Sequence, residues 1–129
     1  MHPRTLSKIR NVKIPKSIEI VKPLGFFDFT KLEKNAFCLI TDSGTVPEES
    51  LYFKVPSVTI RETTERPEFV EAGFNIISGL ELNDILRSVS IITSNKIKGE
   101  WDPTFGNGQT STKVLNIITG KFNRIKYLE

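Results

Sequence analysis

A turn of small residues inside the segment TDSGTVPEES, at positions 41–50, combines groups that bind anions with groups that repel them. Gly44 permits an unusual backbone angle and the close approach of a ligand, while Ser43 and Thr45 supply hydroxyl groups. If a helix begins here, its free N–H groups favour phosphate oxygens. The segment therefore predicts a pyrophosphate-binding turn, although similar turns also precede capped helices in proteins that bind no ligand.

The two glutamates that follow this turn have different expected roles. Thr45 and Glu48 have the T-x-x-E spacing of a capping box, with Pro47 tolerated in the first turn, so Glu48 is expected to be structural. Glu49 comes one residue later and points elsewhere. Its carboxylate could accept two hydrogen bonds from a vicinal diol, as acidic residues do for the ribose of nucleotides.

Other residues could complete such a site. Arg66 precedes Pro67, the expected first residue of a helix, so its guanidinium could turn toward the same crevice; the alternative, for Arg61 as well, is a surface salt bridge. The segment GFFDF, at 25–29, holds three phenylalanines, of which two are expected in the core and one could stack on a nucleobase. His2, the sole histidine, is either inert or a hydrogen-bond or proton donor beside a phosphate.

Alternating strand-like and helix-like segments must position these residues. Apolar runs rich in β-branched or aromatic residues predict strands at 17–21, 37–41, 57–61 and 74–78. Helical spacing of apolar residues predicts helices at 29–36, 47–53, 67–73, 82–93 and 110–122, with Gly73 placed to end the third. This order is typical of an α/β domain with a parallel sheet of about four strands and right-handed crossovers, in which ligands bind beyond the carboxyl ends of the strands.

Composition and charge exclude several classes of protein. The 129 residues make about one domain, and a net charge of +3, from 18 basic and 15 acidic residues, is too small and too scattered for a dedicated nucleic-acid binder. Cys38 is the only cysteine, which excludes an intrachain disulfide and a cysteine-based zinc cluster and fits a reducing, cytoplasmic setting. No apolar run approaches the roughly 18 residues that span a membrane.

Taken together, these residues resemble the C-terminal part of the UDP-N-acetylglucosamine 2-epimerase family, especially members acting in capsule and surface-polysaccharide synthesis. The motifs that carry the resemblance are HPR at 2–4, DSG at 42–44 with EE at 48–49, TTERPE at 63–68 and GNGQTSTKVLNII at 106–118. The resemblance implies two Rossmann-like domains of the GT-B type. Residues 1–129 would form the C-terminal part of the second domain, so the N-terminal domain is expected to be absent from this chain.

The resemblance also implies a site for the UDP group of a UDP-sugar. Phe29 corresponds to the aromatic residue that contacts the uracil, and Ser43, Gly44 and Thr45 correspond to the diphosphate-binding turn. Glu49 corresponds to the acid that holds the ribose hydroxyls. The remaining implied site residues are Arg66, from the TERP motif, and His2, which approaches the diphosphate and is the one catalytic candidate.

The reaction implied is the elimination of UDP across C1 and C2 of the sugar, followed by its re-addition with inverted configuration at C2. Some members hydrolyse the intermediate instead, and neither a metal nor a redox cofactor is required. The carboxylates that move the protons belong to the N-terminal domain, so we expect the isolated chain to be inactive unless a partner chain supplies that domain. This chain has Gly44-Thr45 where many relatives have the second glycine of DSGG, and the branch of the family that acts on deoxysugars shares this feature. The TTERPE motif belongs to the more general pattern, so the identity of the sugar stays open.

Two other functions remain as alternatives to a portion of an epimerase. One is a non-catalytic nucleotide-binding or interaction module, and the other is the UDP-sugar-binding domain of a GT-B glycosyltransferase. The order DSG followed by TERPE favours the epimerase over the transferase. On any of these interpretations, missing strands would leave a sheet edge unpaired and an apolar face uncovered, so a homo-oligomer is possible.

Overall fold

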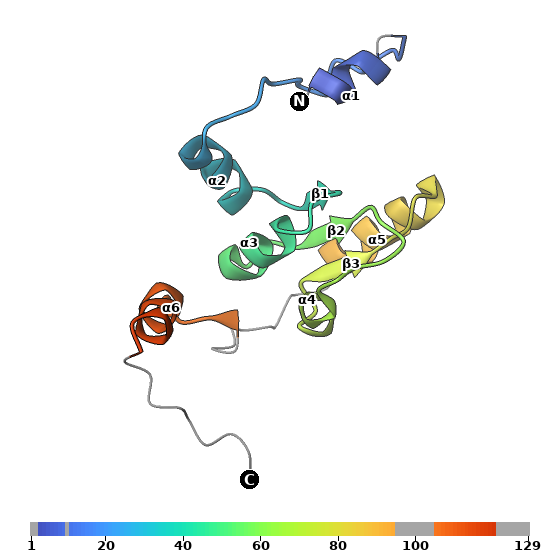
Figure 1. The fold of residues 1–129 in the computed structure, drawn as a ribbon. Helices are drawn as coiled ribbons and strands as arrows, with labels where there is room; N and C mark the ends of the chain where they lie inside the picture. Colours follow the sequence, from blue (N-terminus) through green and yellow to red (C-terminus); the bar gives the residue numbers. More distant parts are fainter. Residues whose placement is uncertain (1–2, 10, 95–104, 121–129) are drawn as a thin grey trace.

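A three-stranded parallel sheet forms the centre of the protein (Figure 1). The computed structural model describes residues 3–9, 11–94 and 105–120. In order across the sheet, the strands are β1 (Leu39–Thr41), β2 (Ser57–Thr59) and β3 (Asn75–Ile77). Ile40 pairs with Val58, and Val58 pairs with Ile76. Because the strands are parallel and in register, the loops that follow them leave from one edge of the sheet.

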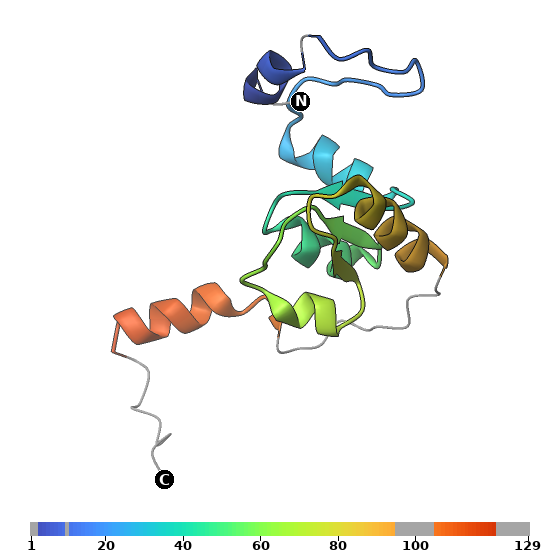
Figure 2. The same cartoon turned by 90° about the vertical axis from the view of Figure 1, so that its right-hand side faces the viewer.

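The two faces of this sheet are covered, in the described part, by the helices α3 (Val46–Phe53), α4 (Pro67–Glu71) and α5 (Leu82–Ser94). The other helices of this part are α1 (Pro3–Lys8), α2 (Phe26–Lys34) and α6 (Thr110–Ile118). The helices α3 and α4 are the crossovers between successive parallel strands and share one face, while α5 packs on β2 and β3 from the other. Both α1 and α6 lie away from the sheet in the two views of Figures 1 and 2.

Local sequence signals explain where the two crossover helices begin and end. Pro47 stands in the first turn of α3, and the helix ends at Lys54, which adopts a left-handed backbone with a φ of 58°. Pro67 opens α4 in the same way, and Gly73 follows its end with a φ of 78°. The prediction that Gly73 ends this helix is therefore confirmed, since a positive φ favours glycine.

The hydrophobic core lies between these crossover helices and the sheet. Leu51 of α3, Phe69 of α4 and Phe74 are all buried and pack together. Phe105 stacks on Phe69 with 5.1 Å between the ring centroids, and Ala72 packs against the same cluster. Burial of each large apolar side chain contributes about 1.5–3 kcal/mol, so this cluster is what fixes α3 and α4 on the sheet.

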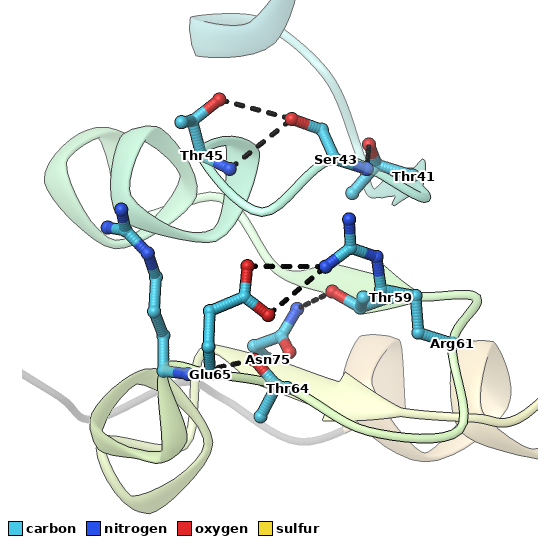
Figure 3. Close-up of polar contacts among 9 residues, drawn as sticks. Thr41, Ser43, Thr45, Thr59, Arg61, Thr64, Glu65 and Asn75 are labelled. Atoms are coloured by element: carbon cyan, nitrogen blue, oxygen red, sulfur yellow. Dashed lines mark hydrogen bonds and ion pairs between the residues drawn. The ribbon is translucent and has the colours of Figure 1, made fainter.

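Hydrogen bonds between buried side chains join the layers beside this core. Ser50 of α3 donates from Oγ to Ser57 Oγ at 2.9 Å, and Ser57 Oγ donates to the carbonyl oxygen of Phe74 at 3.1 Å. The Asn75 amide donates to Ser57 Oγ at 2.9 Å and to Thr59 Oγ1 at 2.8 Å, the second bond being visible in Figure 3. These contacts satisfy polar groups that would otherwise be costly to bury.

The α/β class and the parallel sheet flanked by helices are confirmed, but the predicted strand at 17–21 is wrong. In this segment Ile18, Ile20 and Val21 are exposed and irregular, and the sheet of the described part has three strands rather than about four. A strand exists through hydrogen bonds to a neighbouring strand, and none of the described strands lies beside these residues. Within the described ranges, none of the helices has both the length and the apolar character needed to cross a bilayer.

The expectation that two of the three phenylalanines at 25–29 belong to the core is also wrong. Phe26, Phe27 and Phe29 are 70%, 85% and 44% exposed. They lie in the first half of α2, whose main contact is with α3, and the side chain that this helix buries is Glu33. These three aromatic rings therefore lie outside the core of the described protein.

Candidate functional site

Hydroxyl groups shape the turn that links β1 to α3. Ser43 donates its backbone N–H to Thr41 Oγ1 at 3.0 Å, and Thr45 donates its backbone N–H to Ser43 Oγ at 3.3 Å (Figure 3). The Ser43 and Thr45 hydroxyl oxygens are themselves hydrogen-bonded at 3.1 Å. These bonds hold Ser43, Gly44 and Thr45 together at the N-terminus of α3, as the sequence predicts.

The predicted capping box, in contrast, does not form. Thr45 is the N-cap residue of α3, but its backbone is helical, with φ −97° and ψ −30°, and its side chain caps no helix amide. A capping side chain reaches the helix from an extended backbone, which Thr45 lacks. Glu48 instead forms an ion pair with Arg66, so its role is tertiary rather than local.

The loop after β2 approaches the same turn. Arg61 Nη1 lies 3.2 Å from Glu65 Oε2, and Figure 3 shows this pair facing the turn. A Cβ at position 44 would lie 2.8 Å from Glu65 Oε1 and 3.7 Å from Arg61 Nη1, so the absence of a side chain at Gly44 admits this close contact. A hollow of about 370 Å³ opens beside the pair, lined by Ile60, Arg61, Glu62, Thr63, Glu65 and Leu80.

Arg66 connects the two crossover helices. It is the N-cap residue of α4 and donates its backbone N–H to Thr64 Oγ1 at 3.1 Å, while its guanidinium pairs with Glu48 of α3. Both Arg66 and Arg61 thus form salt bridges with glutamates, which was the alternative to ligand contact. The Arg66 side chain is still about a third exposed, and its charge offsets that of Glu48 at the start of α3.

Glu49 lies against a carboxyl group that the sequence analysis did not single out. Glu33 of α2 is 1% exposed, and its pKa is raised from 4.5 to about 7, first by burial and then by the charge of Glu49 and a hydrogen bond with it. Its burial depends on how α2 packs on α3, which local sequence does not report. One signal was available, because Glu33 follows Phe29 by four residues and shares its side of the helix.

The structure brings most of the predicted site residues to one region. The turn at 43–45 and Glu49 lie at the start of α3, and Arg66 reaches it from the N-cap of α4 through its ion pair with Glu48. Phe29 is carried by α2, which packs on α3. His2 lies outside the described residues. In the part of the chain that the structure describes, histidine, cysteine and acidic side chains form no group of three that could hold a metal ion.

These residues can perform a defined piece of recognition chemistry. A helix N-terminus with adjacent hydroxyl groups favours an anion, and the pairing of Glu48 with Arg66 reduces the repulsion that an anion would meet. Glu49 is half-buried in the first turn of α3 and presents a carboxylate to hydroxyl donors. The half-exposed ring of Phe29 offers a surface for stacking.

Comparison with known proteins identifies the family to which the chain is similar. The family described as UDP-N-acetylglucosamine 2-epimerase matches residues 1–119. The UDP-N-acetylglucosamine 2-epimerase of Methanocaldococcus jannaschii is 40% identical over an alignment of 129 positions, and this alignment covers 95% of this chain and 35% of that protein. The enzyme of the same name from Campylobacter jejuni is 35% identical over 113 residues, covering 83% of this chain and 29% of that protein.

Solved structures agree with this match. The M. jannaschii enzyme in complex with UDP-GlcNAc and UDP has a TM-score of 0.83 at 39% identity, covering 92% of this chain and 34% of that chain. The enzyme from Rickettsia bellii has a TM-score of 0.83 at 34% identity, with the same coverage. The chain thus spans about a third of the length of these relatives. From its sequence and its fold, the chain belongs to the UDP-N-acetylglucosamine 2-epimerase family.

Proposed function

We propose that this chain is the C-terminal, UDP-binding portion of an enzyme that epimerises a UDP-sugar at C2 by eliminating and re-adding UDP. The observation that carries the proposal is the convergence of the 43–45 turn, the N-terminus of α3 and the Glu49 carboxyl at the edge where the strands end. The solved relative with UDP-GlcNAc and UDP supports the choice of ligand.

Each part of the nucleotide has a proposed partner. The turn at 43–45 and the first amides of α3 bind the diphosphate, with Arg66 lining the site and His2 approaching it. Glu49 accepts hydrogen bonds from the ribose hydroxyls, and the Phe29 ring stacks on the uracil. These roles require no metal and no redox cofactor.

A comparison of two nucleotides tests the ribose contact. We expect UDP to bind the 129-residue chain about tenfold more tightly than 2′-deoxy-UDP, since a hydrogen bond to a charged acceptor is worth about 1.5 kcal/mol or more. In Glu49→Gln this preference should largely disappear, whereas Glu68→Gln, an exposed acid in the first turn of α4, should keep it. Calorimetry measures the affinities.

Weak binding is detected by a second measurement. Backbone amide NMR shifts of the ¹⁵N-labelled chain should change in the 43–45 turn when UDP is added to millimolar concentration. Unchanged shifts there, or an undiminished preference for UDP in Glu49→Gln, would show that this is not the nucleotide site.

A separate experiment addresses catalysis. We propose that the isolated chain is inactive, because groups that move the sugar proton must lie within hydrogen-bond reach of it and belong to the N-terminal domain. Mixing the chain with the remaining N-terminal part of the M. jannaschii relative should then epimerise UDP-GlcNAc at C2, while neither part alone does so. NMR of the sugar nucleotide follows the product. No turnover at any ratio would favour the alternative of a non-catalytic nucleotide-binding module.

A further inference from the structure

Glu33 is a buried acid that forms no ion pair with the basic residues of the described part of the chain. It is 1% exposed, and neither of its carboxylate oxygens has a hydrogen-bond donor among the described residues. An ionised carboxylate in such a place would lose its hydration and gain nothing in return. The surroundings therefore favour a form of Glu33 that carries, or shares, a proton.

The group that faces Glu33 is another acid. The helix α2 has its main contact with α3, and on α3 the carboxyl of Glu49 is near enough to raise the pKa of Glu33 through its charge and a side-chain hydrogen bond. Two ionised carboxylates can only accept hydrogen bonds, so they repel each other, whereas one proton between them makes a strong bond. The state in which the two carboxyl groups share one proton is therefore favoured.

The other charged groups nearby do not replace that proton. On α3, Glu48 is already paired with Arg66 of α4. On α2 itself, the basic residues Lys31 and Lys34 are exposed, and so is Asp28 in its first turn. Neither Glu33 oxygen accepts a hydrogen bond from these lysines.

We propose that Glu33 is a positioning residue, which donates a hydrogen bond to Glu49 and so holds the Glu49 carboxylate in place to accept hydrogen bonds from the ribose diol of the nucleotide. This role rests on the proposed function of the site. It adds a second acid, on a different helix, that never touches the ligand but decides whether the ligand's sugar is recognised. It also implies that ribose recognition depends on pH.

The direction of that dependence follows from the pair. The pKa of Glu33 is raised to about 7 by burial and by the Glu49 charge, so below this pH Glu33 is a neutral hydrogen-bond donor that faces Glu49. Above it Glu33 loses its proton and can no longer donate, the hydrogen bond between the two groups is lost, and the new charge on Glu33 repels the Glu49 carboxylate from its position. The preference for ribose should therefore weaken as the pH rises through about 7.

Variants at position 33 separate positioning from packing. In Glu33→Gln the amide donates to Glu49 at every pH, so the preference for UDP over 2′-deoxy-UDP should stay constant across pH 7. In the wild type this preference should fall about tenfold over the same range, as expected for one charge-assisted hydrogen bond. In Glu33→Met, which is similar in size but has no donor, it should be low throughout. Glu71→Gln, an exposed acid at the end of α4, is the matched control and should behave as the wild type.

UDP and 2′-deoxy-UDP carry the same phosphates, so the titration of these phosphates cancels in the ratio of the two affinities. A ligand-free measurement accompanies the binding data: the carboxyl carbon of Glu33, followed by ¹³C NMR, should titrate near pH 7 in the wild type and at lower pH in Glu49→Gln.

Three results would count against the inference. A pH profile in Glu33→Gln that equals the wild-type profile, or titration of Glu33 at an ordinary glutamate pKa, would overturn the positioning role and leave the proposed function intact. Absence of any ribose-dependent UDP binding by the wild type, at every pH, would overturn the proposed function and the positioning role together.

Discussion

The acidic side chains at the start of α3 are accommodated in two different ways. Glu48 is neutralised by Arg66 from the next crossover, and Glu49 shares its surroundings with the buried Glu33. An anion that approaches the 43–45 turn therefore meets less negative charge than the sequence EE at 48–49 indicates. Two acids beside an anion-binding turn are compatible once each has its own partner.

The stability of the protein should depend on pH through Glu33. Its folded-state pKa of about 7 exceeds the ordinary 4.5, so the folded protein binds this proton more tightly than the unfolded chain does. The contribution is fully present below pH 4.5, declines as the pH rises, and is lost once the pH passes about 7. The free energy of unfolding should fall by at most about 3 kcal/mol over this window.

Chemical denaturation below pH 4.5 and above pH 7 measures this change. The decline should be absent from Glu33→Gln and present in Glu71→Gln, whose carboxyl is exposed. Equal slopes in Glu33→Gln and the wild type would mean that Glu33 is not the group responsible.

Single residues were predictable from sequence where their role is local. Ser43, Gly44 and Thr45 occupy the expected turn because a glycine flanked by hydroxyl residues before a helix limits the backbone strongly. Glu48 was assigned wrongly because a tertiary ion pair replaced the local cap. Glu33 was missed because its burial arises only when α2 meets α3, and its spacing of four residues from Phe29 was the one sequence signal for it.

Among the elements, the helices bounded by proline and glycine were the easiest to predict. Pro47 marks the start of α3, and Pro67 and Gly73 mark the two ends of α4. The strands β1, β2 and β3 fall inside the predicted runs, although each is shorter than its run. The strand predicted at 17–21 does not form, because an apolar pattern indicates burial only. A strand also needs a neighbouring strand to pair with, which the pattern cannot reveal.

At the scale of the whole molecule, apolar side chains are exposed near the free edge of the sheet. β1 is an edge strand, and α5 packs mainly on β2 and β3, so Ile40 of β1 remains 54% exposed. Phe37, just before this strand, is 80% exposed. An unpaired strand edge beside apolar side chains promotes association with another chain.

We therefore predict that the chain self-associates and that Ile40→Lys reduces the association, because an inserted charge at a strand edge opposes pairing. Sedimentation velocity over a range of protein concentrations measures the effect. Leu86→Lys is the matched control, since Leu86 is 59% exposed on α5, a helix that packs on β2 and β3. A wild-type chain that stays monomeric at all concentrations would contradict the prediction.

The buried side chains that link Ser50, Ser57, Thr59 and Asn75 have a consequence for how the sheet is assembled. An apolar interior tolerates sliding, because one methyl group replaces another at little cost. Here a shift of β3 by a single position would carry the Asn75 amide away from both hydroxyl acceptors and strand it in a dry interior. The network therefore favours a single register of the strands, and this register also fixes where the loops that follow them lie.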